Sequence, residues 1–409
     1  MVARFLATSS TEMQSVAVGW QIYSITHRPL DLGLVGLAQF LPGICLFLNG
    51  GHVADRAPRQ KIMQTCYSAF SLCSALLLAL TLHRLTSVYP IYIVLLLNGV
   101  VRAFNAPAGQ AILPLLVETH DFPNAVAWAS SFFQVATVAG PIVGGMLYGL
   151  TGSPLVVYSS AVCCYFVAFL LLRGVHIRTA VRPVVSTSVR TVLEGVRYIC
   201  RNKLILGAMS LDLFAVLLGG AVALLPLYAK EILDVGAIGL GILRSAPGFG
   251  AVVTAMGLAH WPLKRNAGAA MLTGVFLFGV FTIVFGLSRS FPLSLIALVL
   301  IGAFDMISVI VRHTMVQLAT PDEMRGRVSA VNVVFISASN EIGQFESGIT
   351  AQWFGAVPAV VIGGIGSIFI VIAWMSMFPA LRRVNRLVPE SGKPDILEEA
   401  VIERDAAVE

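Results

Sequence analysis

The 409-residue chain is 57% apolar and 12% charged, and its mean hydropathy is +0.85. A soluble protein carries about 25% charged residues, most of them on its exterior. So little charge excludes a soluble fold of this length, and the bilayer is the expected solvent for much of the surface. The net charge of +6 does not indicate nucleic acid, because the basic residues stand in short segments between apolar runs.

Twelve segments are apolar over the roughly 20 residues that a spanning helix needs. They are 4–26, 31–53, 62–82, 88–107, 122–148, 154–173, 204–229, 238–259, 267–287, 292–314, 327–351 and 357–378. The first is the weakest, and residues 4–12 are too polar for a signal peptide. We therefore predict an N-terminal bundle over 1–173, a central loop over 174–203, a C-terminal bundle over 204–378 and a tail over 379–409.

The basic residues predict the orientation of these segments. With both termini in the cytoplasm, 19 Lys and Arg lie on the cytoplasmic side, 4 lie on the other side and 4 fall within helices. Such an excess follows the positive-inside rule. We expect a multi-pass protein of the bacterial inner membrane with both termini, the central loop and the tail in the cytoplasm.

The two halves repeat each other in sequence. At a shift of 203 residues, Gly99 aligns with Gly302, Gly140 with Gly343 and Gly145 with Gly348; at 205, Gly36 and Pro42 align with Gly241 and Pro247. Duplicated halves joined by a basic loop are typical of transporters, whose substrate site lies between the halves near the membrane midplane.

Two motifs carry chemistry. Gly51, Asp55, Arg56 and Arg59 lie between the second and third segments, where a carboxylate paired with arginine could hold the cytoplasmic face shut. An ordinary positive-inside loop is the alternative. In the fifth segment, Gly140, Pro141, Gly144 and Gly145 allow bending and close packing, as an antiporter-type hinge or as a packing kink without directional meaning.

Residues 51–61 resemble the loop signature of the major facilitator superfamily, although Gln60 stands where a basic residue is usual. Residues 140–145 resemble the antiporter motif of its exporting members. Residues 14–23, 102–108, 224–229 and 320–328 resemble the branch of bacterial enterobactin exporters and macrolide-efflux proteins. The resemblance implies an all-α membrane fold of twelve helices in two pseudo-symmetric bundles. It also implies proton-coupled export of a siderophore, macrolide or other drug.

Charges within apolar segments are costly and therefore the best candidates for function. Glu12 lies roughly 12 Å into the first segment and Arg102 roughly 8 Å into the fourth, at 1.5 Å per residue. Burial disfavours a charged carboxyl whereas a nearby arginine favours it, so such a pair can exchange a proton. A static salt bridge between two helices is the alternative.

The second half has its own embedded acids, Asp212, Asp305 and Glu341, with Arg244 and Arg312 as possible partners. Each acid could take part in coupling or serve the structure alone. Trp20 and Phe133 are weaker candidates for the wall of a substrate cavity, because aromatic residues more often face lipid or a neighbouring helix.

Three function classes are consistent with these patterns to different degrees. The leading one is a proton-coupled exporter, whose partners are a small molecule, protons and the bilayer; the alternatives are an uptake permease of the same fold and a membrane enzyme. The sequence has no nucleotide-binding loop, no catalytic constellation and no metal-ligand spacing. We therefore predict a monomer that is not an enzyme and has no cofactor.

Overall fold

The computed structural model describes residues 1–83, 87–118, 120–175, 189–263 and 265–384, apart from the side chains of 47–52, 54–56, 111 and 189–191. All regular structure in these ranges is helical. The first half contains α1 (Val2–Thr26), α2 (Pro29–Arg56), α3 (Arg59–Leu82), α4 (Tyr89–Ile112), α5 (Phe122–Thr151) and α6 (Leu155–Arg173). The second contains α8 (Lys203–Leu218), α10 (Gly236–His260), α11 (Ala267–Leu287), α12 (Phe291–Leu318), α13 (Asp322–Phe354) and α14 (Ala356–Met377).

Ten stretches of the described chain are long and apolar enough to cross a membrane. The long helices α1 and α13 are not among them, because they carry more charged and polar side chains. Their length still suffices, since 25 and 33 residues at 1.5 Å each exceed the hydrocarbon thickness of about 30 Å. The least apolar helices of the bundle are thus the ones that bring Glu12 and Glu341 into it.

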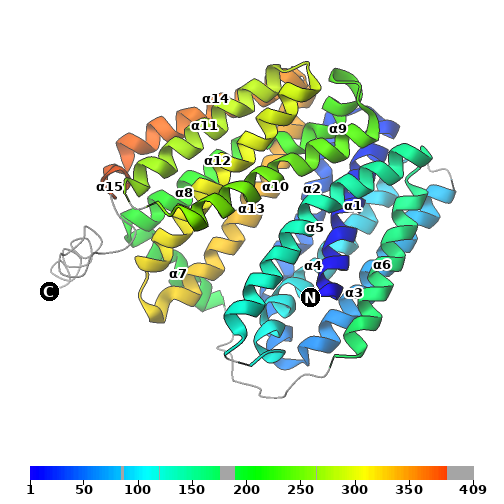
Figure 1. Ribbon diagram of the computed structural model, residues 1–409, viewed down its shortest axis with the longest axis horizontal. Helices are drawn as coiled ribbons and strands as arrows, with labels where there is room; N and C mark the ends of the chain where they lie inside the picture. Colours follow the sequence, from blue (N-terminus) through cyan, green and yellow to red (C-terminus); the bar gives the residue numbers. More distant parts are fainter. Residues whose placement is uncertain (84–86, 119, 176–188, 264, 385–409) are drawn as a thin grey trace.

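The helices form two groups that follow the two halves of the sequence (Figure 1). In the first group α1 packs on α5 and α6, α2 on α4, and α3 on α4 and α6. In the second group α10 packs on α12, α11 on α12 and α14, and α13 on α8 and α14. The domain limits at 173, 203 and 378 stay predictions.

The seventh predicted span, 204–229, is interrupted. After α8 the chain passes through the 3-10 turn η2 (Ala221–Leu224), the short α-helical turn α9 (Leu225–Leu227) and the π-helical turn η3 (Tyr228–Ile232). The interruption follows Gly219 and Gly220, and Gly220 lies against the backbone of Gly343 in α13. Two adjacent glycines give the backbone its greatest freedom and allow this close approach.

The central segment also differs from the predicted loop, because residues Val189–Arg201 form a helix, α7. Ile199 is buried, Gly195 lies against the backbone of Arg327, and Glu194 forms a 2.9 Å ion pair with Arg327. The hydrophobic residues of α7 recur at helical spacing. This pattern predicts a helix, but a search for segments long enough to span the membrane overlooks it. Helix α7 is therefore attached to α13 of the second half. A short helix, α15 (Pro379–Arg383), begins the tail.

The two halves meet through α2 against α13 and α5 against α10. A Cβ at Gly348, Gly145 or Gly241 would collide with the backbone of the other helix, and one at Gly33 would lie only 3.0 Å from the carbonyl oxygen of Gln344. Glycine therefore permits both contacts, and the two contacts occupy equivalent places in the sequence repeat. Both contacts lie near the first residues of α2 and α10 and near the last residues of α5 and α13. We call this end of the molecule, where the two halves touch, the closed end.

Buried apolar residues gather in four clusters, two of which lie mainly in each half. One cluster of the second half also takes in Val16, Tyr23 and Leu32 of α1 and α2. The core is therefore continuous across the halves near the closed end.

Candidate functional site

A polar cavity of about 190 Å³ lies between the halves. Its walls come from α1, α2 and α4 on one side and from η2, α9, α10 and α13 on the other. It is lined by Thr11, Glu12, Ser15, Gly19, Leu32, Val35, Gly36, Gln39, Arg102, Ala223, Pro226, Arg244, Glu341 and Gln344. Three of the five predicted transport residues, Glu12, Arg102 and Glu341, are thus brought together here.

One pair of charges crosses the cavity from α4 to α13. The Nη1 atom of Arg102 lies 3.8 Å from Oε1 of Glu341 and donates a 2.9 Å hydrogen bond to Oε1 of Gln39. Gln344 donates a 3.2 Å hydrogen bond to the other carboxylate oxygen of Glu341. The partner of Arg102 in this structure is therefore Glu341, whereas the sequence reasoning paired it with Glu12.

A second carboxylate and a second guanidinium group, Glu12 of α1 and Arg244 of α10, line the same cavity. Arg244 lies within electrostatic range of both Glu12 and Glu341. The four groups form a quartet of two carboxylates and two guanidinium groups, which is neutral when all four are charged. Each half supplies one acid and one base, so the quartet links the halves electrostatically.

The predicted hinge in α5 positions this quartet. Gly140 lies against Ser9 and Glu12 of α1, and Gly144 lies against the backbone of Met13. On the other side, the carbonyl of Pro141 lies beside Gly241 of α10. The motif therefore lets α5 sit close to both the helix that carries Glu12 and the helix that carries Arg244.

The other two predicted acids lie apart from the cavity, between α8, α12 and α13. Oδ2 of Asp212 forms a 3.1 Å ion pair with Nη2 of Arg312, and Nη1 of Arg312 donates a 2.9 Å hydrogen bond to Oδ1 of Asn332. Asp212 and Arg312 are buried, at 6% and 3% exposure. Asp305 is only partly buried and interacts electrostatically with both.

The closed end carries polar contacts that the sequence reasoning missed. Tyr23 donates a 2.5 Å hydrogen bond to Glu231, and Nζ of Lys230 donates a 3.0 Å bond to Ser24. Glu231 and Lys230 belong to the π-helical turn η3, and single π-helical turns often occur at functional sites. The 3.6-residue period of hydrophobic residues does not distinguish a π-helical turn from an α-helix, so this turn could not be predicted from the sequence pattern.

The predicted cytoplasmic gate is only partly described. The side chains of Gly51, Asp55 and Arg56 lie outside the described residues, whereas Arg59 begins α3 and is half-buried. Gln60, where the family usually has a base, donates hydrogen bonds of 2.6 and 2.7 Å to the carbonyls of Leu172 and Val175. This amide fastens α3 to the end of α6, a role that requires no positive charge.

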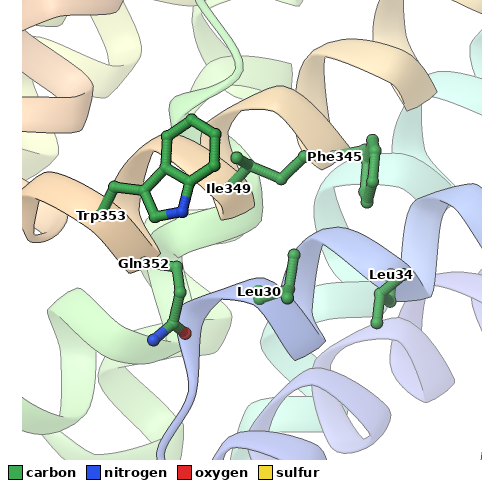
Figure 2. A pocket seen from close by; sticks show the side chains of 6 residues that line it. All are labelled: Leu30, Leu34, Phe345, Ile349, Gln352 and Trp353. Carbon is green, nitrogen blue, oxygen red and sulfur yellow. The ribbon is translucent and has the colours of Figure 1, made fainter.

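Neither of the two aromatic candidates lines the central cavity. Trp20 packs edge-on against Tyr148, and Phe133 is 44% exposed. A separate apolar pocket of about 330 Å³ lies between α2 and α13 near the closed end, where Figure 2 shows the side chains of both helices. It is lined by Leu30, Leu34, Phe345, Ile349, Gln352 and Trp353. Because it contains no charged side chain, the polar cavity remains the candidate transport site.

A family model described as "Transmembrane secretion effector" matches residues 1–407 of the chain. The chain belongs to this family of major facilitator transporters. The enterobactin exporter EntS of Shigella boydii serotype 4 is 26% identical over 397 residues, which cover 95% of this chain and 93% of that protein. The protein is therefore a membrane transporter and not an enzyme, as the sequence predicted.

Solved structures confirm the fold. The crystal structure of the nucleoside transporter NupG aligns with a TM-score of 0.72 at 13% identity, covering 92% of this chain and 97% of that one. A bacterial homologue of the human lysosomal transporter Spinster, solved in an inward-facing and occupied conformation, aligns at 0.70 and 14% identity, covering 93% and 94%. The predicted major facilitator fold is thus confirmed for this transmembrane secretion effector.

Proposed function

We propose that this secretion effector is a secondary exporter that uses the proton gradient to move an amphiphilic small molecule out of the bacterial cytoplasm. The observation that carries the proposal is the neutral quartet of Glu12, Arg102, Arg244 and Glu341 in a cavity between the halves. Hydrogen-bonding and charged groups at this place can orient the polar part of a substrate, and breaking their pairs lets the halves move apart.

The direction of movement follows from the predicted orientation. If both termini are cytoplasmic, the closed end faces outwards, and the cavity is in the state that receives substrate from the cytoplasm. Gly145 and Gly241 then form part of the outer seal. Export requires this seal to open while a new contact closes the cytoplasmic end, which is the role we propose for Asp55, Arg56 and Arg59. We expect the protein to do this as a monomer in the inner membrane.

The substrate class rests on the relatives. A protein 26% identical over almost its whole length is named an enterobactin exporter, so a siderophore is the first substrate to test. A cationic drug such as ethidium tests the broader alternative within the same proposal.

Accumulation of ethidium and of labelled enterobactin in intact cells tests the direction. We expect cells that contain the protein to retain less of at least one compound than cells that contain Arg102→Glu at equal membrane abundance. Greater retention of a compound in cells with the unaltered protein would identify an uptake permease and contradict the proposal.

A further inference from the structure

The cluster of Asp212, Asp305, Arg312 and Asn332 differs from the central quartet in its charge. It contains two carboxylates and one guanidinium group, so it carries one negative charge too many when all three are ionised. An uncompensated charge inside a membrane protein is energetically costly. The central quartet has no net charge without an additional ion. This cluster reaches zero net charge only when it binds a proton or another monovalent cation.

The surroundings offer no other buried countercharge among the described residues. The other bases of α8 and α12, Lys203 and His313, are both exposed. Helix α11, which packs along α12, has no ionisable side chain. The ionisable groups of α10 are Arg244, in the central cavity, and His260, at the exposed last residue of the helix. On α13 the flanking charges are engaged elsewhere, Arg327 with Glu194 and Glu341 with Arg102.

The hydrogen bonding of the cluster is incomplete in a way that fits a proton. Asp305, Ser308 and Arg312 lie at i, i+3 and i+7 and therefore on one face of α12. Oγ of Ser308 and Nε of Arg312 are buried and have no hydrogen-bond partner among the described residues. A carboxylate can only accept, whereas a protonated carboxyl offers one donor and one acceptor. A protonated Asp305 could therefore donate to Ser308 and accept from Arg312.

We propose that Asp305, together with Asp212 and Arg312, is the binding site of the transported proton, separate from the substrate cavity. Asp212 is held by Arg312 through a direct ion pair, whereas Asp305 forms no direct ion pair with a described residue. The proton binds as its O–H bond forms at Asp305 and leaves when that bond breaks; no other bond changes.

This inference rests on the proposed function, because a bound proton can be coupled to export only if the protein is an exporter. The separation from Glu12 and Glu341 implies that the substrate and the proton do not occupy the same groups. Coupling would then pass through α12 and α13, since α13 carries both Asn332 of the proton site and Glu341 of the cavity.

Infrared spectroscopy of the purified full chain, without substrate, tests the proton site. We expect a carbonyl band of one protonated carboxyl that disappears as the pH is raised. Asp305→Asn should lose this band, and Asp212→Asn should also lose it, because Asp305 would then be balanced by Arg312. Glu346→Gln, a control on α13 whose carboxylate accepts a hydrogen bond from Thr350, should keep it.

The variants are expected to fold, because each replaces a carboxyl by an amide of the same shape, and either aspartate variant keeps one carboxylate whose charge balances that of Arg312. A band that persists in both aspartate variants would overturn the proposal. So would a band that sodium chloride, but not potassium chloride, abolishes, because the cluster would then be a sodium site. If the band behaves as expected while no probe moves under a pH gradient, the proton site stands and the exporter proposal fails.

Discussion

At the scale of single residues, the cavity depends on charges that balance each other across the halves. Arg102 and Glu341 are 3.8 Å apart, and their helices belong to different halves. An ion pair at this distance is worth little at an exposed surface but more where water is scarce. Removing one partner leaves the quartet with one uncompensated charge in a cavity that must also bind a substrate.

Reversing the two charges tests this pair. Arg102→Glu and Glu341→Arg should each lower the rate of export at least about tenfold, because like charges then face each other across the cavity. The double variant should recover a substantial part of the rate, since the attraction is restored with reversed sign. The measurement is the initial rate of ethidium or enterobactin export at equal protein abundance. No recovery in the double variant would show that the two residues act independently.

The sequence revealed the embedded charges but not their partners. Glu12, Arg102 and Glu341 could be selected because charged residues are rare in spanning segments. Their pairing depends on how the halves are placed relative to each other, which helical periodicity does not encode. Arg244 was named only as a possible partner for the same reason, and polar residues such as Gln39 and Gln344 gave no signal at all, because amides are common on helix surfaces.

At the scale of helices, glycines determine how the halves approach. A Cβ at residue 145 would lie 2.6 Å from the carbonyl oxygen of Ala237 and 2.8 Å from Cα of Gly241. Both contacts involve backbone atoms, which cannot rotate away as a long side chain can. The same repeat of glycines was visible in the sequence, so the close approach of the equivalent helices was predictable, whereas the π-helical turn η3 and the helix α7 were not.

Gly145→Ala therefore tests the seal at the closed end. The added methyl group should separate α5 from α10 and favour the state that is open at this end. A cysteine introduced at the cavity residue Ser15, in a chain without other cysteines, reports this as faster labelling by an impermeant maleimide in intact cells.

The matched control is Gly43→Ala, because a Cβ at residue 43 meets no atom within 4 Å. It should leave the labelling rate of Ser15→Cys unchanged. Equal labelling rates in Gly145→Ala and in the unaltered background would show that these glycines do not control the seal.

At the scale of the whole molecule, the orientation decides which way the cavity faces. The count of 19 basic residues against 4 predicts that α7 and both termini lie in the cytoplasm. The pseudo-twofold axis between the halves runs along the membrane normal, so it keeps the two ends of the molecule distinct without indicating which of them faces the cytoplasm. The asymmetry of charge is therefore the observation that indicates the direction.

Cysteine labelling checks this orientation with a residue of the native chain. Cys200 of α7 is exposed. With Cys200 as the sole cysteine, an impermeant maleimide should label everted vesicles but not intact cells. Ser290→Cys, at the exposed connection between α11 and α12, should show the reverse pattern. Labelling of Cys200 in intact cells would invert the topology and with it the proposed direction of transport.

The most direct measurement of proton-driven export is uptake by everted inner-membrane vesicles under an imposed, inside-acid pH gradient. In such vesicles the cytoplasmic face points outwards, so an exporter carries its substrate into the lumen. We predict that vesicles containing the protein take up labelled enterobactin or ethidium faster than vesicles without it. This excess should vanish when nigericin collapses the gradient and should be absent in Asp305→Asn. Uptake that is equal with and without the gradient for both compounds would contradict proton-driven export.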